Sequence, residues 1–550
     1  MSRRSIALLV GLLVLFVMLR VPGLDIPYQQ DEFKDVVVSE GELAKASEYF
    51  THPPLTALLF WGSAHVVGGT HMRLVPLFFG LLSAILLYLV VRRRFDERTA
   101  LTSLFLYTIS FSSIWSSLAI GTDGTVLPAL FLGAVFLYDR ALEEPKRQLW
   151  WAALVLVLLT GLMVKLSFIL VLGALLLDFI FQNRAAIRVQ HLWYGAVALG
   201  GALIASVLLF IGVRLLYPSF SFGGMITHAL FYVQFSGRQY LQIVVQGIKT
   251  VYYLSPLLLV PLLFLSRDML LRARVFVVYL GLGSLFYFIL FDFSRGALDK
   301  YLLFMAAPFS VLAGVAITST FRGVTRTQLF WGIGFGLLGA LVVWLCNLLP
   351  QTAVPLYPKT EWFGRVLHGE WNVLTPFNGG SGPVGFYISF LTIGVAFGVS
   401  FFVALAGRIW RDARPIVVLV VVGIGIAYNA VFFEELVFGK INGSPVVVLT
   451  PSLAYIASAP EIGSVLTYND IGAYELTHMG RYAGRFYAAP RFEEGHKKLF
   501  SEHRGAYLVI GLPPLYEGFY KDYFTHCAIL FETSSQAVPA TVYSCKPANI

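Results

Sequence analysis

The sequence is poor in charge. Asp, Glu, Lys and Arg together make up 13% of its 550 residues, against 57% hydrophobic residues and a mean hydropathy of +0.74. A chain this apolar cannot stay folded in water, so the composition excludes a set of soluble domains. The sequence also lacks the sustained alternation of apolar and polar residues that marks a transmembrane β-barrel. We therefore expect a polytopic α-helical membrane protein.

Cysteine is scarce as well, with three residues in the chain. The sequence has no Cys/His spacing typical of zinc sites, no P-loop and no dinucleotide-binding fingerprint, so nothing in it supports ATP-driven transport. Cys346 lies in an apolar run, whereas Cys527 and Cys545 lie near the C-terminus. If the C-terminal segment is outside the cytosol, we expect a disulfide between these two; the alternative is two free thiols.

Apolar residues are gathered in thirteen runs, most of them close to the roughly 18 to 22 residues that a helix needs to cross a bilayer. The predicted spans are 6–24, 74–91, 99–119, 124–138, 149–163, 166–181, 193–216, 250–265, 275–291, 301–319, 329–349, 385–406 and 415–433.

The net charge of +9 reflects the segments between these runs. If the N-terminus is cytosolic, 19 of the 40 Lys and Arg residues fall in seven short cytosolic segments that hold only seven acids. The positive-inside rule then predicts a cytosolic N-terminus and an extracytoplasmic C-terminus in the inner (plasma) membrane. Because the basic residues serve topology, we expect no nucleic-acid partner.

This topology divides the chain into two parts. Residues 1–433 form the predicted transmembrane domain, with outer loops at 25–73, 217–249 and 350–384. Residues 434–550 are expected to form a small extracytoplasmic α/β domain. Its predicted strands are 445–449, 464–468, 506–510 and 541–544, and a polar helix is expected around 493–503.

Two groups of acids are predicted at the outer membrane face. Asp31 and Glu32 follow the first span, where partial desolvation would raise their basicity, as a catalytic base for a hydroxyl needs. The alternative is an ordinary polar loop. Asp123, in the turn Ile120-Gly121-Thr122-Asp123-Gly124, either caps the next helix or forms a carboxylate pair with Asp31.

Lys165 is an amine between two apolar runs, also predicted at the outer face. It either extends its ammonium group to the lipid headgroups or contacts a phosphate. We expect no metal site and no obligatory cofactor, although the paired acids would also suit a divalent cation.

Several motifs occur in an order that resembles a known family. The sequence resembles the GT-C glycosyltransferases of the protein O-mannosyltransferase and lipid A aminoarabinose transferase type, which take a sugar from a polyprenyl phosphate. The resemblance covers residues 1 to about 320. It rests on Asp31-Glu32, His52-Pro53-Pro54-Leu55, Arg73-Leu74, Arg92-Arg93-Arg94-Phe95, Asp123, Lys165 and Lys300-Tyr301-Leu302-Leu303, and departs from the family at Leu118-Ala119-Ile120 and Leu166-Ser167.

The resemblance implies an inverting sugar transfer to an acceptor hydroxyl of a protein, lipid A or a surface or cell-wall glycan. Asp31 would be the general base, with Glu32 as the alternative, and Asp123 would orient the acceptor or the first-loop helices. The donor phosphate would be held by Lys300, Lys165, His52 and Tyr301.

Two other classes of protein compete with this interpretation. In a transporter or lipid flippase, Lys165 would be a substrate or proton site within the bundle. The thirteen runs show no obvious inverted repeat, and the acids cluster at one face, which argues against transport. A receptor or assembly subunit would need no chemistry in the loops, because the tail would do the binding.

Overall fold

The computed structural model describes residues 2–144, 146–183, 189–216, 220–233, 237–292, 299–321, 323–377 and 382–545. The chain forms two compact units. The helical unit comprises Met1–Leu24, Asp35–Leu329 and Ala404–Val418. The tail unit comprises Asp25–Lys34, Phe330–Val403 and Leu419–Ile550, so it contains the Asp31-Glu32 pair as well as the C-terminal domain.

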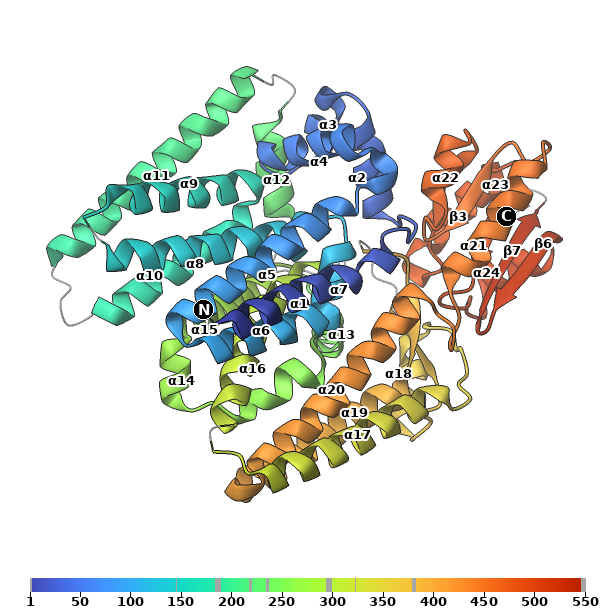
Figure 1. The fold of residues 1–550 in the computed structure, drawn as a ribbon. Helices are drawn as coiled ribbons and strands as arrows, with labels where there is room; N and C mark the ends of the chain where they lie inside the picture. The colour runs from blue at the N-terminus through green and yellow to red at the C-terminus, as the bar shows by residue number, and fades with distance from the viewer. Residues whose placement is uncertain are drawn as a thin grey trace. The chain divides into compact units, whose positions relative to one another are not determined.

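The helical unit consists of helices and short turns (Figure 1). Its helices are α1 (Arg3–Met18), α3 (Leu43–Tyr49), α4 (Pro54–Val67), α5 (Leu74–Arg94), α6 (Glu97–Ile109), α7 (Phe111–Leu118), α8 (Leu127–Glu143), α9 (Gln148–Val164), α10 (Ile169–Asn183), α11 (Val189–Leu216), α12 (Phe222–Phe231), α13 (Tyr240–Leu259), α14 (Arg267–Arg272), α15 (Arg274–Leu285) and α16 (Ala306–Thr320).

Four helices have residues in both units, and the remaining elements belong to the tail unit. The shared helices are α2 (Asp31–Glu40), α17 (Arg326–Leu348), α19 (Phe390–Ile409) and α20 (Arg414–Val437). The tail unit adds α18 (Lys359–Leu367), β1 (Leu374–Phe377), β2 (Phe386–Ser389), α21 (Pro445–Ser458), β3 (Val465–Tyr468), α22 (Ala473–His478), β4 (Tyr482–Phe486), α23 (Glu493–Glu502), β5 (Ala506–Ile510), α24 (Phe519–Thr525), β6 (Ala528–Ser535) and β7 (Val538–Ser544).

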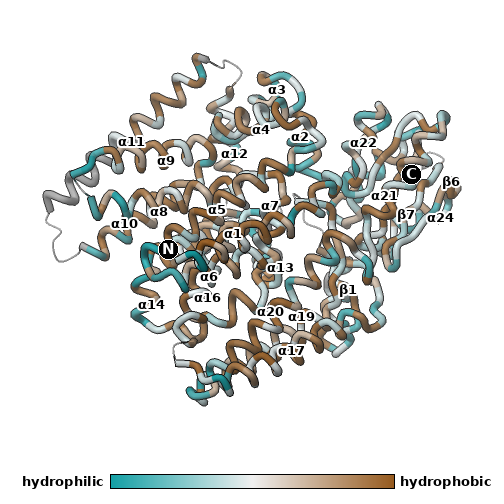
Figure 2. The backbone as a smooth tube through the Cα atoms, viewed as in Figure 1, coloured by the Kyte–Doolittle hydropathy of each residue, from teal (hydrophilic) through white to brown (hydrophobic). Residues whose placement is uncertain are grey.

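Among the described residues, eight helices are long and apolar enough to cross a membrane, and each corresponds to a predicted span. Figure 2 shows the apolar character of helices such as α5, α17 and α20. The eight are Arg3–Gly23, Gly69–Arg94, Thr122–Glu143, Ile243–Phe264, Lys300–Thr320, Arg326–Leu348, Phe390–Ile409 and Arg411–Val437. The predicted helical membrane protein is therefore confirmed.

The other five predicted spans have a different form, and the count of thirteen is not confirmed. The run 99–119 is interrupted at Ser110, whose extended backbone (φ −68°, ψ 133°) separates α6 from α7. The remaining four appear as shorter apolar helices, at Gln148–Val164, Leu166–Gln182, Leu203–Leu215 and Arg274–Leu290.

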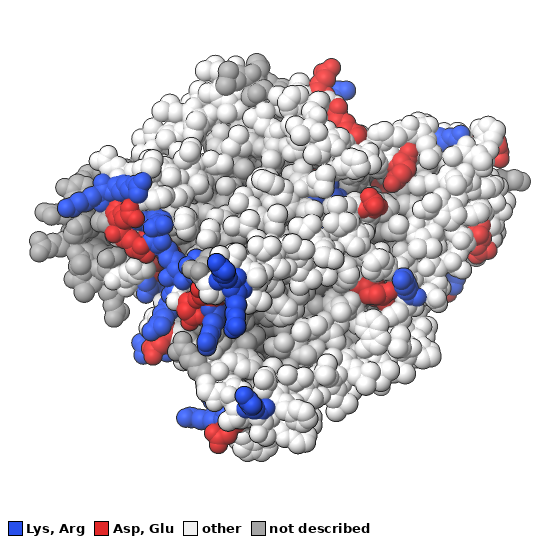
Figure 3. Space-filling model, in the orientation of Figure 1, with Lys and Arg blue, Asp and Glu red and all other residues white. Residues whose placement is uncertain are grey.

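Charged residues gather at one end of the helical unit. On the face drawn in Figure 3, many Lys and Arg residues lie near the start of α1 together with a few acids. Arg94, at the end of α5, donates to both carboxylate oxygens of Asp139 in α8 at 2.7 and 2.6 Å. Asp96 caps α6 by accepting from the Thr99 amide at 2.8 Å, which satisfies one otherwise unpaired helix N–H.

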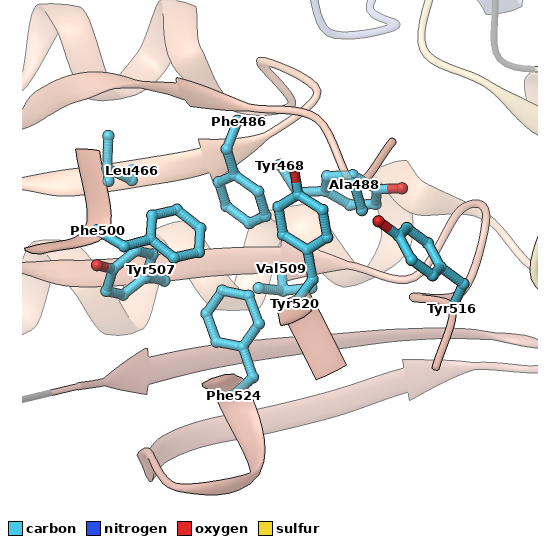
Figure 4. Close-up of a cluster of buried hydrophobic side chains, with 10 residues drawn as sticks. All are labelled: Leu466, Tyr468, Phe486, Ala488, Phe500, Tyr507, Val509, Tyr516, Tyr520 and Phe524. Atoms are coloured by element: carbon cyan, nitrogen blue, oxygen red, sulfur yellow. The ribbon is translucent and has the colours of Figure 1, made fainter. Parts of the chain in front are cut away.

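The tail contains a five-stranded sheet in the order β4-β3-β5-β7-β6. β3 pairs in parallel with both β4 and β5, whereas β7 pairs antiparallel with β5 and β6. An aromatic core lies against the sheet, and Figure 4 shows rings from β4, α23, β5 and α24 facing one another, among them Phe486, Phe500, Tyr507 and Phe524. The predicted strands 464–468, 506–510 and 541–544 and the helix around 493–503 are confirmed.

One predicted strand was wrong. Residues 445–449 form the first turn of α21 instead. Pro445 stands at the start of this helix, where its fixed φ suits helical geometry and its missing N–H costs nothing. Tertiary packing then outweighs the strand propensity of the valines: Tyr455 of α21 stacks on Phe531 of β6 with ring centroids 5.0 Å apart. The predicted disulfide between Cys527 and Cys545 is present.

Candidate functional site

Asp123 and Lys165 form a buried ion pair in the helical unit. Asp123 is the second residue of the π-helical turn η3 (Thr122–Val126), which leads into α8. Lys165 occupies the extended break (φ −155°, ψ 133°) after α9, as its position between two apolar runs predicted. Its Nζ lies 2.5 Å from Asp123 Oδ2, and the two side chains are only about one-tenth exposed. A single turn of π-helix at such a position is typical of functional sites.

The second carboxylate oxygen of Asp123 has no hydrogen-bond partner among the described residues. Asp123 lines a cavity of about 10 Å³, roughly the room for one water. The polar side chains around this cavity are those of Ser167, Tyr279 and Tyr287. The carboxylate therefore combines a fixed contact to an ammonium with an oxygen that is free to accept a hydrogen bond from a hydroxyl or from water.

Two ammonium groups flank one aromatic ring beside this pair. Lys165 Nζ lies 4.5 Å and Lys300 Nζ 5.1 Å from the centroid of the Tyr301 ring. The ring's negative face attracts both cations, which helps to hold like charges close together. The structure thus brings together three of the four residues predicted to hold the donor phosphate.

His52 is the fourth, and it is in the same region. Its ring lies 5.6 Å from that of His228 in α12, and both Lys165 and Lys300 are close enough to act on it electrostatically. Burial, reinforced by these neighbouring positive charges, lowers the pKa of His52 well below 6.5. At neutral pH the imidazole is therefore uncharged, and it can donate a hydrogen bond to a phosphate but adds no positive charge.

Two buried arginines have a structural role that the sequence patterns did not indicate. Arg20 and Arg73 have no exposed surface. Arg20 donates to the carbonyl of Thr108 at 3.0 Å and to the hydroxyl of Ser113 at 2.9 Å, on either side of the break between α6 and α7. Arg73 donates to the carbonyl of Leu118 at 2.5 Å, at the other end of α7. The two guanidinium groups fix α7, and α7 leads directly to the turn that carries Asp123.

Asp31 and Glu32 begin α2 and belong to the tail unit. Glu32 is fully buried, and its amide donates to the Gln29 carbonyl at 3.1 Å. Gln30 adopts a left-handed conformation (φ 50°), so the chain turns sharply just before the acids. Because Asp123 belongs to the helical unit, the carboxylate pair of Asp31 with Asp123 stays a prediction.

No metal-binding cluster is found in the part of the chain that the structure describes. Within it, no group of three or more His, Cys, Asp or Glu residues is arranged to hold a metal ion.

Comparisons with known proteins agree with this architecture. Residues 51–210 match the family described as dolichyl-phosphate-mannose-protein mannosyltransferase. The fold is similar to that of ArnT from Cupriavidus metallidurans in the apo state, with 16% identity, a TM-score of 0.52 and coverage of 97% of this chain and 98% of the other. ArnT from the same organism bound to undecaprenyl phosphate has 16% identity and a TM-score of 0.54, with 98% of both chains covered.

None of the curated protein sequences matches the chain. The predicted fold is nevertheless confirmed, because the similarity to ArnT extends over nearly the whole of both chains. The chain is a multi-pass membrane protein with the GT-C glycosyltransferase fold, and its residues 51–210 carry the sequence pattern of the dolichyl-phosphate-mannose-protein mannosyltransferases.

Proposed function

We propose that the protein transfers a sugar from a polyprenyl-phosphate donor to an acceptor hydroxyl at the outer face of the membrane. The observation that carries this proposal is the cluster of Lys165, Lys300, Tyr301 and His52 beside Asp123, within a GT-C fold. The binding of undecaprenyl phosphate by the similar ArnT supports a donor of this lipid class. The acceptor is a protein, lipid A or a surface or cell-wall glycan.

The cluster suits a phosphate leaving group. When the glycosidic bond breaks, the departing polyprenyl phosphate gains negative charge, and fixed cations in a dry site stabilise that charge without having to reorganise. In this proposal Lys165 and Lys300 supply the positive charge, and neutral His52 donates a hydrogen bond. Tyr301 keeps the two ammonium groups in place.

The acids have separate roles in the proposal. Asp31, or Glu32 in its place, removes the proton from the acceptor hydroxyl as that oxygen attacks the anomeric carbon, which inverts its configuration. Asp123 orients Lys165 through Oδ2 and accepts a hydrogen bond from the acceptor through Oδ1. No step requires a nucleotide, because the sugar arrives already activated on its lipid.

The experiment is a transfer assay in proteoliposomes. A panel of undecaprenyl-phosphate-linked hexoses and pentoses is supplied with native cell-envelope extract as the acceptor, and released undecaprenyl phosphate is measured. We expect Asp31→Asn or Glu32→Gln to lower the rate by about 10²- to 10⁴-fold, the range for loss of a general base. Glu48→Gln is the matched control, because Glu48 is an exposed acid in the same outer loop.

A second measurement tests donor binding. Lys300→Met should weaken binding of undecaprenyl phosphate, whereas Lys498→Met, at a side chain that is 79% exposed in the tail, should not. Full transfer activity in both Asp31→Asn and Glu32→Gln would contradict the assignment of the base. Movement of the lipid-linked sugar across the bilayer without release of its lipid phosphate would instead support a flippase.

A further inference from the structure

A strained acid lies just after β3 in the tail. Asn469 and Asp470 both adopt left-handed backbone conformations, with φ of 58° and 60°. Such conformations are uncommon for residues other than glycine and persist where the surrounding structure enforces them. Asp470 is also completely buried. A buried carboxylate on strained backbone needs specific partners.

Asp470 finds these partners on the neighbouring edge strand, β4. One oxygen accepts from the Tyr482 hydroxyl at 2.6 Å, and the other pairs with Arg485 at 2.6 Å. Burial raises the pKa of Tyr482, and the negative charge of Asp470 raises it further, so the hydroxyl remains a donor. Each oxygen of the carboxylate thus contacts a side chain on β4.

The oriented side chains contact the segment that carries the acid pair. Phe33, immediately after Glu32, packs edge-on against the Tyr482 ring with centroids 5.1 Å apart. On the other side of the pair, Tyr28 packs edge-on against Tyr474 of α22 at 5.0 Å. The two aromatic contacts therefore bracket Asp31 and Glu32 in the sequence.

Asp31 is also close enough to Tyr487 to act on it electrostatically. Burial raises the pKa of Tyr487, which follows β4, and the charges of Asp470 and then Asp31 raise it further. The Arg485 guanidinium lies 5.0 Å from the centroid of the Tyr487 ring. Arg485 therefore contacts both the buried carboxylate of Asp470 and the ring of Tyr487.

The boundary between the two compact units agrees with these contacts. It falls inside α2, between Lys34 and Asp35. The first turn of this helix, with both acids, belongs to the tail unit, although it lies more than 400 residues before the tail sheet in the chain.

We propose that Asp470 and Tyr482 are positioning residues for Asp31 and Glu32. The buried carboxylate of Asp470 fixes the Tyr482 ring, and Phe33 packs on that ring. The packing of Phe33 in turn fixes the position of the two acids that precede it. The assignment of a catalytic role to that pair rests on the proposed function. The positioning itself does not, so the two are tested separately. The tail would then influence sugar transfer by holding the general base, Asp31 or Glu32, in position, in addition to any contact that it makes with an acceptor.

Hydrogen–deuterium exchange on the full-length protein in nanodiscs tests the positioning. Tyr482→Leu removes both the ring and its hydrogen bond, and we expect several-fold faster exchange in a peptide covering residues 25–34. Tyr482→Phe keeps the ring but loses the hydrogen bond to Asp470, so we expect an acceleration between that of Tyr482→Leu and the wild-type chain. Phe519→Leu is the matched control, because it removes a ring that stacks on Phe500 in the tail core, where centroids are 5.7 Å apart. Unchanged exchange at 25–34 in Tyr482→Leu, or equal acceleration in Phe519→Leu, would overturn the proposal.

The transfer assay then separates positioning from general damage to the tail. Tyr482→Leu and Asp470→Asn should lower kcat by about 10- to 100-fold, the effect of misplacing a reacting group by about 1 Å, and leave KM for the lipid-linked sugar unchanged. In an Asp31→Asn, Glu32→Gln background, Tyr482→Leu should cause no further loss. A further loss of similar size in that background would show that Tyr482 acts by another route. If the wild-type chain shows no turnover but Tyr482→Leu accelerates exchange, the proposed function fails and the positioning stands.

Discussion

The Asp123–Lys165 pair allows its structural and chemical roles to be separated by experiment. Two opposite charges lie 2.5 Å apart, and each side chain is about nine-tenths buried. Lys165→Met leaves a buried carboxylate without its partner, which typically costs about 3–5 kcal/mol of the free energy of unfolding. Asp123→Asn should cost less, because Lys165 keeps its contact with the Tyr301 ring, worth about 0.5–2 kcal/mol.

The double variant Lys165→Met, Asp123→Asn has no unpaired charge, so we expect most of the stability to return. The coupling energy of the double-mutant cycle should therefore reach about 2–4 kcal/mol. It is measured by reversible unfolding in mixed micelles, with the transfer assay applied to the same preparations. The double variant should be stable and yet inactive, because the ammonium group that binds the leaving phosphate is absent.

A second ion pair in the same unit is the matched control. Arg94 and Asp139 lie 2.6 Å apart, and their side chains are 11% and 12% exposed. The corresponding double variant, Arg94→Met, Asp139→Asn, should recover both stability and transfer. A coupling energy below about 1 kcal/mol for Asp123–Lys165 would refute the energetic reasoning. Transfer by the double variant Lys165→Met, Asp123→Asn would refute the chemical role of Lys165.

Three further predictions concern pH, the disulfide and orientation. The pKa of His52 in the folded chain lies below its ordinary 6.5, so the unfolded chain binds this proton first as pH falls. The free energy of unfolding should therefore decrease as pH falls below 6.5. Thermal unfolding at pH 8 and pH 5 measures this loss, which should be smaller in His52→Gln. Reducing the Cys527–Cys545 disulfide, whose partners are 18 residues apart, should lower the unfolding free energy of the tail by about 3 kcal/mol in denaturant titrations. In intact cells an impermeant thiol reagent should label Glu494→Cys in the tail, and Glu143→Cys only after permeabilisation; the opposite pattern would reverse the proposed orientation.

The sequence predicts local features of this protein better than its long-range contacts. Lys165 separates two apolar runs, and α9 ends just before it. This break could be predicted locally, because an ammonium group is costly in the middle of a continuous membrane-spanning helix. Pro445 precedes three valines whose strand propensity is overridden by packing on the sheet, which no local pattern encodes.

In the candidate site, too, the motifs could be predicted from the sequence, whereas the long-range contacts could not. The order of the motifs predicted that Lys165, Lys300, Tyr301 and His52 would serve one ligand, and the structure brings them together. The contact between Phe33 and Tyr482 joins residues about 450 positions apart, and nothing in either local sequence indicates it. An arginine inside the predicted span 6–24, Arg20, was the one available signal in the sequence for the support of α7.

Arg20 has a consequence for how the protein is made. Outside the first span, it donates to the Thr108 carbonyl and the Ser113 hydroxyl, 88 and 93 residues further along the chain. At a synthesis rate of about 5–20 residues per second, these groups leave the ribosome roughly 5 to 20 seconds after Arg20 does. During that interval the guanidinium of the first helix must be solvated by lipid headgroups or by the insertion machinery. The buried guanidinium therefore gains these two hydrogen bonds only after α6 and the first residues of α7 have been synthesised.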